Sequence, residues 1–249
     1  MVDVHSHVLW GLDDGAETLE ESTAMLAMAA VSGTTDIVAT PHANLRYRFD
    51  EGLVTERIRE LTVATGGQPR IHRGCDFHLS FENVQDALQN PEKYTVNGGR
   101  YLLVEFPDSS LYNMKQVLEA LMHRGLIPIL THPERHPQLR ELNTDFEEWV
   151  GMGCLVQITG QSLLGRFGKK SEGSAWEMLR RGMAHFVASD AHGTTDRTPR
   201  LDEAFTAVSQ GKGRECAERL FIRNPAAVIS DEPIQPAAKR RKAWFGFRR

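Results

Sequence analysis

The sequence predicts an α/β protein folded as a distorted seven-stranded (β/α) barrel of the TIM-barrel type. About seven short aliphatic or β-branched runs alternate with helical patterns, which is typical of parallel β-α units. Some of these runs, such as Leu126–Leu130, are almost entirely apolar, as expected of strands covered on both faces. The length of 249 residues is one that α/β barrels reach as a single domain. An open doubly wound sheet is the alternative architecture.

The first half of the chain supplies four predicted strands. Alternation over residues 2–8 indicates a strand with Val2, Val4, Ser6 and Val8 on one face. Thr18 and Glu21 have the spacing of a capping box, which predicts a helix from there to about Val31. Further strands are predicted at 36–40, 70–75 and 101–106, with helices at 53–64 and 81–89 between them.

The second half repeats the same alternation of helix and strand. Helices predicted at 114–124, 146–152 and 174–181 lead to strands at 126–131, 154–159 and 184–189, and more helices follow. No internal repeat is evident. We expect one domain over residues 1–230 and a separate, flexible basic tail over residues 231–249.

Composition and charge narrow the class of protein. A hydrophobic content of 41% and a charged content of 25% are those of an ordinary globular protein. The three cysteines are widely spaced and form no CxxC pair, which predicts reduced thiols and a cytoplasmic protein. We expect no membrane span, since no apolar run reaches the roughly 18 residues that a span needs. We also expect no signal peptide, because the His5-x-His7 segment begins within five residues of Met1 and no apolar h-region precedes it. Residues 237–249 carry six basic side chains and no acid, so the net charge of −4 leaves −10 on residues 1–236. Such an acidic body argues against nucleic-acid binding.

The basic tail permits two interpretations. Lys239–Lys242 precede Trp244, Phe245 and Phe247, a mixture typical of segments that contact a membrane surface or an acidic partner. Contact of this kind would bring the protein to the inner membrane surface. The competing interpretation is a disordered, solubilising tail.

A pair of histidines in the first strand indicates a metal site. His5 and His7 are two residues apart, so their side chains share a face of the strand. Two imidazoles on one face can hold a divalent metal such as Zn, Mn or Fe. Other metal-ligand types follow the predicted strands: Asp13, Asp14, His42, Asp76, Glu105, His132, Asp190 and His192. Catalytic groups of β-α barrels gather at the carboxyl ends of the strands, so the sequence predicts a multi-metal site there.

These motifs resemble a known superfamily. The segments are His5-x-His7, Asp13-Asp14-Gly15, Thr40-Pro41-His42, Glu105-Phe106-Pro107, His132-Pro133-Glu134-Arg135 and Ser189-Asp190-Ala191-His192. In this order they are similar to the polymerase-and-histidinol-phosphatase (PHP) superfamily, and within it to the bacterial CpsB/CapC/YwqE-like tyrosine phosphatases. The resemblance spans roughly residues 1–230. It implies a distorted (β/α)7 barrel, a three-metal centre often filled by manganese, with Fe or Zn as alternatives, and hydrolysis of phosphotyrosine on capsule-regulating tyrosine kinases.

The resemblance also implies a ligand set for each metal ion. His5, His7, Glu105 and Asp190 would hold one ion. Asp76, Glu105 and His132 would hold a second, with Glu105 bridging, and Asp14, His42 and His192 would hold a third. The family usually has Glu at the position of Asp76, so this residue is the departure from the pattern.

Charge balance agrees with a phosphate substrate. Four of the expected ligands are carboxylates, and three divalent cations would exceed their charge by two, which suits a phosphate dianion. A water activated by the metals is the expected nucleophile. Arg135 is expected to clamp the phosphate with its planar donors, the alternative being a salt bridge with Glu134 or Glu141.

Three further arginines are weaker candidates for substrate binding. Arg197 follows the Asp190–His192 segment, and Arg46 and Arg48 follow His42 and are expected at the rim of the substrate site. Arg46 and Arg48 are equally well interpreted as ordinary loop residues.

The sequence excludes one mechanism and leaves several functions open. A cysteine-dependent tyrosine phosphatase needs an arginine six residues after its cysteine, whereas Phe81, Gly160 and Ile222 occupy those positions here. The alternatives to a protein-tyrosine phosphatase are a histidinol-phosphate type phosphatase, a nuclease on the same scaffold, and a metal-binding scaffold module without activity. A homo-oligomer is compatible with the sequence.

Overall fold

The computed structural model describes residues 1–107, 111, 113–142 and 144–234. Within them, nine strands pair in parallel in the orders β1-β2-β4 and β3-β5-β6-β7-β8-β9. The strands are β1 (Val2–Ser6), β2 (Asp36–Ala39), β3 (His42–Ala43), β4 (Arg70–Arg73), β5 (Asp76–His78), β6 (Tyr101–Glu105), β7 (Ile127–Thr131), β8 (Leu155–Thr159) and β9 (Phe186–Ala188).

Two of the predicted strands are each divided in two. β2 and β3 follow one another across Thr40 and Pro41, and β4 and β5 across Gly74 and Cys75. Proline has no N–H to give to a ladder, yet the Pro41 carbonyl still accepts from Asp76 N at 3.2 Å. Pairing resumes at His42 and Asp76, so short paired strands continue just beyond the predicted ends of the second and third strands.

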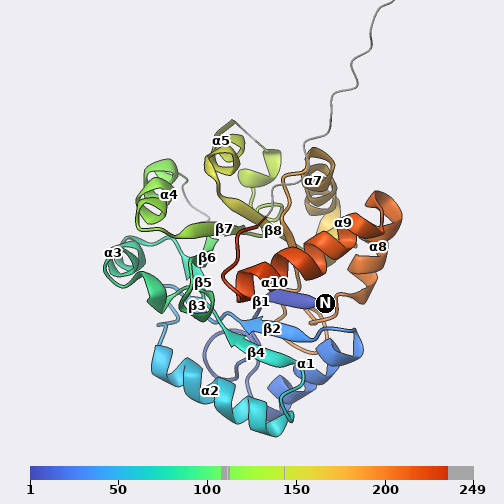
Figure 1. The fold of residues 1–249 in the computed structure, drawn as a ribbon. Coiled ribbons are helices and arrows are strands. Elements are labelled where there is room, and N and C mark those ends of the chain that lie inside the picture. The colour runs from blue at the N-terminus through green and yellow to red at the C-terminus, as the bar shows by residue number, and fades with distance from the viewer. Residues whose placement is uncertain (108–110, 112, 143, 235–249) are drawn as a thin grey trace, which may run out of the picture.

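The first and last strands meet beyond the regular part of β9. His7 N donates to Ala191 O at 2.8 Å, and Asp190 N donates to His5 O at 2.9 Å. With the divided strands joined, seven strands follow one another in sequence order around a distorted barrel (Figure 1). The predicted barrel is confirmed.

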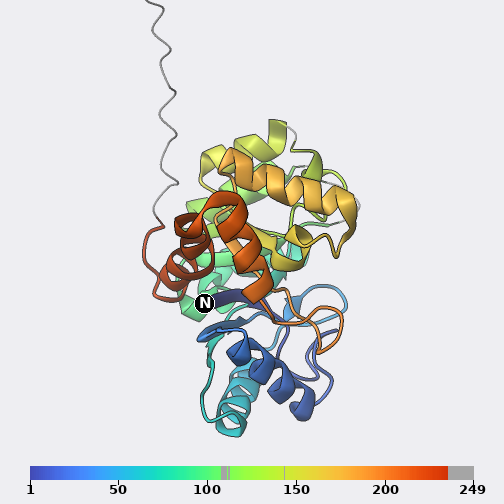
Figure 2. The same ribbon diagram turned by 90° about the vertical axis from the view of Figure 1, so that its right-hand side faces the viewer.

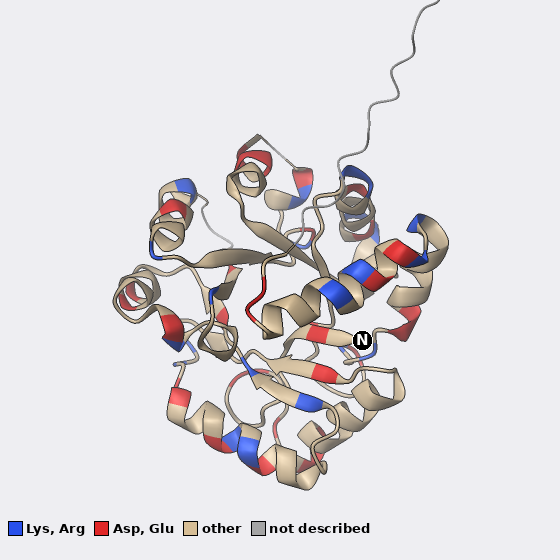
Figure 3. Ribbon diagram, in the orientation of Figure 1, with Lys and Arg blue, Asp and Glu red and all other residues tan. Residues whose placement is uncertain are grey.

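Helices surround the strands on the outside (Figures 1 and 2). They are α1 (Leu19–Val31), α2 (Glu51–Ala64), α3 (Phe81–Gln89), α4 (Met114–His123), α5 (Thr144–Met152), α6 (Gly160–Leu163), α7 (Gly168–Arg181), α8 (Asp202–Lys212), α9 (Arg214–Glu218) and α10 (Asn224–Ile229). Acidic and basic residues are interspersed on these helices in the view of Figure 3. No helix among the described residues is long and apolar enough to cross a membrane.

The starts of α1 and α7 show where local sequence signals predicted a helix end and where they did not. Thr18 accepts from Glu21 N at 3.2 Å, as the capping box predicts, although the Glu21 carboxylate accepts from Glu17 N rather than from the cap residue. α7 begins at Gly168, earlier than the predicted 174. Its first turns contain Gly168 and Gly173. Glycine is a poor helix former, so the helix propensity of these residues does not indicate that the helix starts there.

The barrel interior is apolar at one end and polar at the other. Val4, Leu103, Ile129 and Phe186 pack together in a buried cluster, and Val228 of α10 packs against them. Figure 1 shows α10 lying across this end of the barrel. The opposite end, where the strands finish, is left for polar side chains.

The first strand does not keep a simple alternation. Its register with β2 shifts between Asp3 and Ser6. Val4 consequently packs in the interior cluster although its neighbour His5 reaches the polar end of the same interior. A register shift of this kind disrupts the regular ladder locally and bends the strand.

The segment after α10 also contacts the barrel. The Arg100 guanidinium pairs with Asp231 at 3.1 Å, and the Tyr101 hydroxyl donates to Glu232 O at 2.5 Å. Residues 231–234 thus lie against the base of β6. The remaining tail, residues 235–249, for which a membrane or acidic partner was considered, lies outside the described residues.

Candidate metal centre

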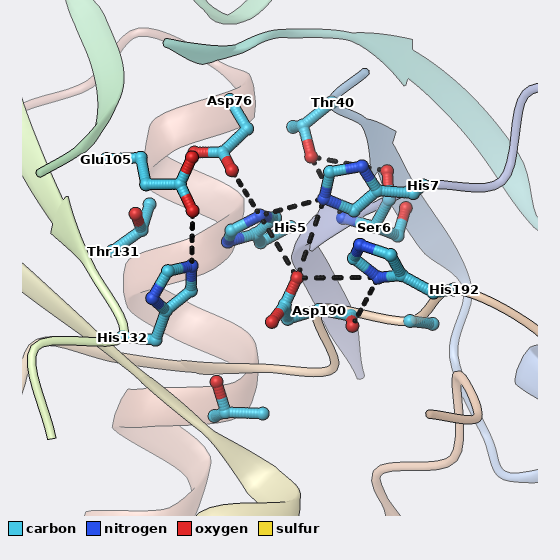
Figure 4. A network of polar contacts seen from close by, with 12 residues as sticks. His5, Ser6, His7, Thr40, Asp76, Glu105, Thr131, His132, Asp190 and His192 are labelled. Atoms are coloured by element: carbon cyan, nitrogen blue, oxygen red, sulfur yellow. Dashed lines mark hydrogen bonds and ion pairs between the residues drawn. The ribbon is translucent and has the colours of Figure 1, made fainter. Parts of the chain in front are cut away.

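Nine side chains of metal-ligand type converge at the carboxyl end of the barrel. Figure 4 shows most of them, labelled His5, His7, Asp76, Glu105, His132, Asp190 and His192. In each of four groups, ligand atoms lie within 4.8 Å of one another. The groups are His7, Asp14, His42 and His192; His5, His132 and Asp190; His5, His7 and Asp76; and His42, Asp76 and Glu105. Together they contain the nine residues that the family resemblance implies as ligands.

The histidine pair lies at the middle of this cluster. His5 Nε2 is 3.3 Å from His7 Nε2 and 3.5 Å from both Asp76 Oδ2 and Asp190 Oδ1. His7 Nε2 is also 3.5 Å from Asp190 Oδ1. Ligands about 2.1 Å from a metal lie about 3.0–3.5 Å from one another in octahedral or tetrahedral geometry. The spacing therefore suits coordination of a shared cation.

His42 connects two parts of the cluster through its two ring nitrogens. Its Nδ1 is 3.2 Å from Asp76 Oδ2 and 3.6 Å from Glu105 Oε2, while its Nε2 is 3.4 Å from Asp14 Oδ1. His192 Nε2 approaches the same Asp14 oxygen at 3.5 Å. Asp14, His42 and His192 thus form a compact group, with His7 beside them.

His132 stands closer to one expected partner than to the other. Its Nε2 is 3.8 Å from Glu105 Oε1, and it falls in a group with His5 and Asp190 rather than with Asp76. The structure brings all nine residues together. Their division among individual ions stays a prediction.

Two residues outside the predicted set orient the histidine pair. His7 Nδ1 donates to Asp13 Oδ2 at 2.7 Å, and His5 Nδ1 donates to Gln157 Oε1 at 3.0 Å. These contacts fix the tautomers and direct both Nε2 atoms into the cluster, as outer-sphere partners of metal-bound histidines do. The sequence marks Asp13 as a residue of metal-ligand type but gives it no role, and it does not single out Gln157. A buried polar residue in the apolar run 155–159 was the available signal.

The loop that carries Asp13 and Asp14 is packed tightly against the segment of His7. Asp13 Oδ1 accepts from Gly15 N at 2.9 Å, and Asp13 Oδ2 accepts from His42 N at 3.0 Å. A Cβ atom at Gly15 would lie 2.2 Å from His7 O, so only glycine fits there.

The ionisable groups of the cluster shift one another's pKa values. Burial opposes the charged imidazolium of His7, but Asp13 raises its pKa to about 9. Burial likewise disfavours ionised Asp76, yet His5 and His42 hold its pKa well below the usual range. For Glu105, burial together with Asp76 raises the pKa to about 7. The carboxylates therefore require positive charge, for which a bound cation would compete with protons.

Unpaired atoms at the centre provide a test of whether a cation fits. Both carboxylate oxygens of Asp76 and the Nδ1 of His42 are buried without a hydrogen-bond partner among the described residues. A buried carboxylate without donors is unfavourable unless it is paired or coordinates a metal. The nitrogen and oxygen donors suit Zn, Mn or Fe, so the residues present fit a metal centre.

Arg135 and Arg197 meet at the edge of the cluster. Both guanidinium groups contact Asp190 Oδ2, Arg197 Nη2 at 2.5 Å. The Arg135 guanidinium also lies over the Phe167 ring, 4.4 Å from its centre. A cavity of about 250 Å³ opens beside Arg135 and is lined by Glu105, Phe106, Thr131, His132, His136 and Leu139.

The alternative interpretation of Arg135 is wrong. Glu134 is buried and accepts from Thr159 N at 2.9 Å and from Ser162 Oγ at 2.7 Å, which fixes the loop between β7 and α5 to the end of β8. Glu141 pairs with Arg140.

Arg46 and Arg48 lie in the loop that follows β3. Arg48 and His42 line a second cavity, of about 200 Å³. The Arg46 guanidinium lies over Tyr47 at 4.9 Å, and the Tyr47 ring stacks on His42 with 6.1 Å between ring centres. The structure therefore places this loop beside a metal-cluster residue.

Comparison with known proteins identifies the family. The family model for capsular polysaccharide synthesis proteins CpsB/CapC matches residues 1–230. The putative tyrosine-protein phosphatase CapC of Staphylococcus aureus is 31% identical over 259 residues, covering 99% of this chain and 100% of the relative. The tyrosine-protein phosphatase YwqE of Bacillus subtilis is 33% identical over 258 residues, covering 99% and 100%.

Solved structures agree in fold. The crystal structures of YwqE from Bacillus subtilis and CpsB from Streptococcus pneumoniae, described as metal-dependent tyrosine phosphatases, match with a TM-score of 0.88 and 30% identity over 95% of this chain and 97% of that chain. A lactonase from Listeria monocytogenes, 12% identical, matches with a TM-score of 0.62 over 94% of both chains and shares the fold alone. The resemblance found in the motifs is confirmed, and the chain belongs to the CpsB/CapC family of capsular polysaccharide synthesis proteins.

Proposed function

We propose that this protein is a metal-dependent protein-tyrosine phosphatase that regulates capsule or exopolysaccharide synthesis. The observation that carries the proposal is the convergence of nine ligand-type side chains on one point at the carboxyl end of the barrel, with two arginines at its edge. The names of the relatives from Staphylococcus aureus and Bacillus subtilis give the same activity.

We propose three divalent cations, Mn²⁺ in the first place and Fe or Zn as alternatives, held by the nine residues as the family pattern implies. Bound cations of this kind supply a nucleophile at neutral pH and neutralise phosphate oxygens. The protein contributes the positions: Asp13 and Gln157 hold the His5 and His7 rings, and Glu134 holds the loop that carries His132 and Arg135.

The reaction is hydrolysis of a phosphate monoester. An oxygen of water forms a bond to phosphorus and gives up a proton, the bond between phosphorus and the tyrosine oxygen breaks, and the tyrosine oxygen takes up a proton, so that tyrosine and inorganic phosphate leave. Arg135 and Arg197 present planar donors to the phosphate oxygens as charge builds up on them. Both now contact Asp190 Oδ2 at the edge of the cluster.

The proposed substrate is a phosphotyrosine protein, and the proposed partner is a bacterial tyrosine kinase of the capsule pathway, which places the reaction in the cytoplasm or at the inner membrane surface. The CpsB/CapC family match supports the link to capsule synthesis.

A substrate panel tests the activity. Purified protein with added Mn²⁺ is offered a phosphotyrosine protein, histidinol phosphate and single-stranded DNA, and product formation is followed for each. We expect rapid turnover of phosphotyrosine only. Degradation of DNA alone, or preference for histidinol phosphate, would overturn the proposal in favour of a nuclease or a small-molecule phosphatase.

Metal analysis tests the centre separately. We expect about three divalent ions per chain, a number that rests on the family pattern, in protein purified without chelator, and loss of activity with their removal. His42→Ala should lower both the ion count and the activity, whereas His123→Ala, at the end of α4, should change neither. Activity that survives exhaustive chelation contradicts a metal mechanism, and bound metal without turnover of any substrate indicates a scaffold module.

A further inference from the structure

Two apolar side chains stand out into solvent next to the metal cluster. Leu45 is 85% exposed and Phe81 is 75% exposed. Leu45 follows β3, which contains His42, and Phe81 begins α3, which follows β5 with Asp76. Single exposed apolar residues are common on protein surfaces, so the position of these two beside the centre is the informative point.

A hydrogen-bonded bridge ties the two segments together. Asn83 Nδ2 donates to Ala43 O at 2.7 Å and to His78 O at 3.0 Å, so the first turn of α3 is fixed to the ends of β3 and β5. The bridge spans the segments that carry Leu45 and Phe81. The backbones of the two segments are thus held relative to one another before any partner binds, which lowers the entropy cost of binding.

The loop that presents Leu45 is itself closed. Asn44 Oδ1 accepts from the backbone N–H groups of Arg46 and Tyr47, each at 2.9 Å, and Asn44 N donates to Tyr47 O at 2.9 Å. Leu45 therefore projects from a well-defined turn.

Positive charge accompanies the apolar pair. Arg46 and Arg48 are exposed, and neither forms an ion pair with a residue in the described part of the chain. Arg46 is held over Tyr47, which stacks on His42, and Arg48 lines the cavity of about 200 Å³ that includes His42. Asp50, the nearest acid in this loop, is engaged in capping α2 at 3.0 Å from Leu53 N.

We propose that Leu45, Arg46, Arg48 and Phe81, here called the rim surface, bind the chain segment that flanks the phosphotyrosine of a protein substrate. An apolar residue next to the phosphotyrosine packs on Leu45 and Phe81, and an acidic residue pairs with Arg46 or Arg48. The inference rests on the proposed phosphatase function and deepens it, since it names the substrate class: phosphotyrosine in an apolar and acidic sequence.

The apolar half is tested with a pair of double variants. Leu45→Ser with Phe81→Ser removes the proposed contact. Val31→Ser with Val63→Ser is the matched control, because these valines are 83% and 77% exposed but lie at the ends of α1 and α2 that lead into the amino ends of β2 and β4, away from the centre.

Three substrates are compared: a phosphotyrosine peptide with leucine beside the phosphotyrosine, the same peptide with serine there, and p-nitrophenyl phosphate. We expect wild type and control to prefer the leucine peptide about tenfold in kcat/KM, through KM. The Leu45–Phe81 variant should lose this preference and hydrolyse p-nitrophenyl phosphate normally.

The contact between an acidic substrate residue and the arginines of the rim surface is tested separately. Arg46→Gln with Arg48→Gln should abolish a preference for a peptide with aspartate near the phosphotyrosine over the same peptide with serine there, measured as the ratio of the two kcat/KM values within each variant. A ratio equal to that of wild type would remove the acidic contact.

Each contrary outcome is distinguishable. An equal loss with p-nitrophenyl phosphate means that the rim supports the metal centre rather than the peptide, and equal kcat/KM of wild type for both peptides removes the apolar contact. Either result overturns the inference and leaves the phosphatase activity intact. If wild type hydrolyses no phosphotyrosine substrate but does hydrolyse histidinol phosphate, the proposed function itself fails.

Discussion

His7 Nδ1 donates a hydrogen bond to Asp13 Oδ2 at 2.7 Å, and this contact directs His7 Nε2 toward His5 Nε2, 3.3 Å away. Asp13 also accepts from His42 N at 3.0 Å. The Asp13 carboxylate therefore positions both the His7 side chain, just after β1, and the backbone of His42 in β3. The precision of the centre depends on residues that do not themselves face the metal position.

We expect Asp13→Asn to weaken metal binding about 10- to 100-fold. In wild type the two carboxylate oxygens accept hydrogen bonds from Gly15 N, His42 N and His7 Nδ1. The amide of asparagine replaces one of these acceptor oxygens by a donor, so at least one of the three hydrogen bonds is lost. Mn²⁺ titration calorimetry measures the affinity, and Glu20→Gln, an exposed acid in the first turn of α1, is the control. An unchanged affinity would show that Asp13 serves only the fold of its loop.

Asp76 should be required for full metal occupancy. Its buried oxygens lie near His5 and His42 and have no hydrogen-bond donor within the described residues. We expect Asp76→Asn to lose about one ion per chain and most of the activity, and Asp76→Glu, which keeps a carboxylate, to retain both. Ion counts by mass spectrometry and kcat decide. Full occupancy in the Asn variant would remove Asp76 from the ligand set.

Arg135 and Arg197 should bind phosphate by geometry as well as charge. Both contact the same oxygen of Asp190, and a lysine keeps the charge but loses the planar fork. We expect Arg135→Lys to raise KM and weaken inhibition by inorganic phosphate about tenfold, and Arg135→Ala to do so by up to about 100-fold. Arg140→Lys, in the following helical turn, is the control. Unaltered inhibition by phosphate in both Arg135 variants would contradict this role.

Stability should fall in mild acid through His185, which lies away from the metal centre. Burial, followed by the nearby Arg219, lowers the pKa of His185 to about 4, against 6.5 for an ordinary histidine. Between these two values the unfolded chain binds more protons than the folded one, so stability is complete above pH 6.5 and declines down to about pH 4. The expected loss is roughly 2–3 kcal/mol after allowance for partial exposure.

The variant His185→Asn isolates this contribution. Its side-chain oxygen can accept from Val156 N as His185 Nδ1 does at 3.1 Å, but it does not titrate. Urea midpoints measured from pH 4.5 to 7.5 should fall less steeply for the variant than for wild type. Parallel curves would mean that His185 is protonated equally easily in the folded state.

Much of the fold followed from local pattern. The order of seven strand regions and the helix of α3 agree with periodicity and capping signals, because apolar spacing and turn residues act over a few positions. The renewed pairing after Pro41, the register shift in β1 and the early start of α7 were not predicted. Each depends on how one strand or helix fits its neighbours.

By itself, the sequence determined which residue types end each strand, and the parallel barrel then required those ends to meet. The tertiary structure alone decided which atoms face one another: Gln157 oriented toward His5, Asp13 toward His7, and Glu134 turned away from Arg135 into the end of β8. These pairings join residues as much as 152 positions apart in the chain. They are fixed by backbone register and packing, which no local pattern encodes.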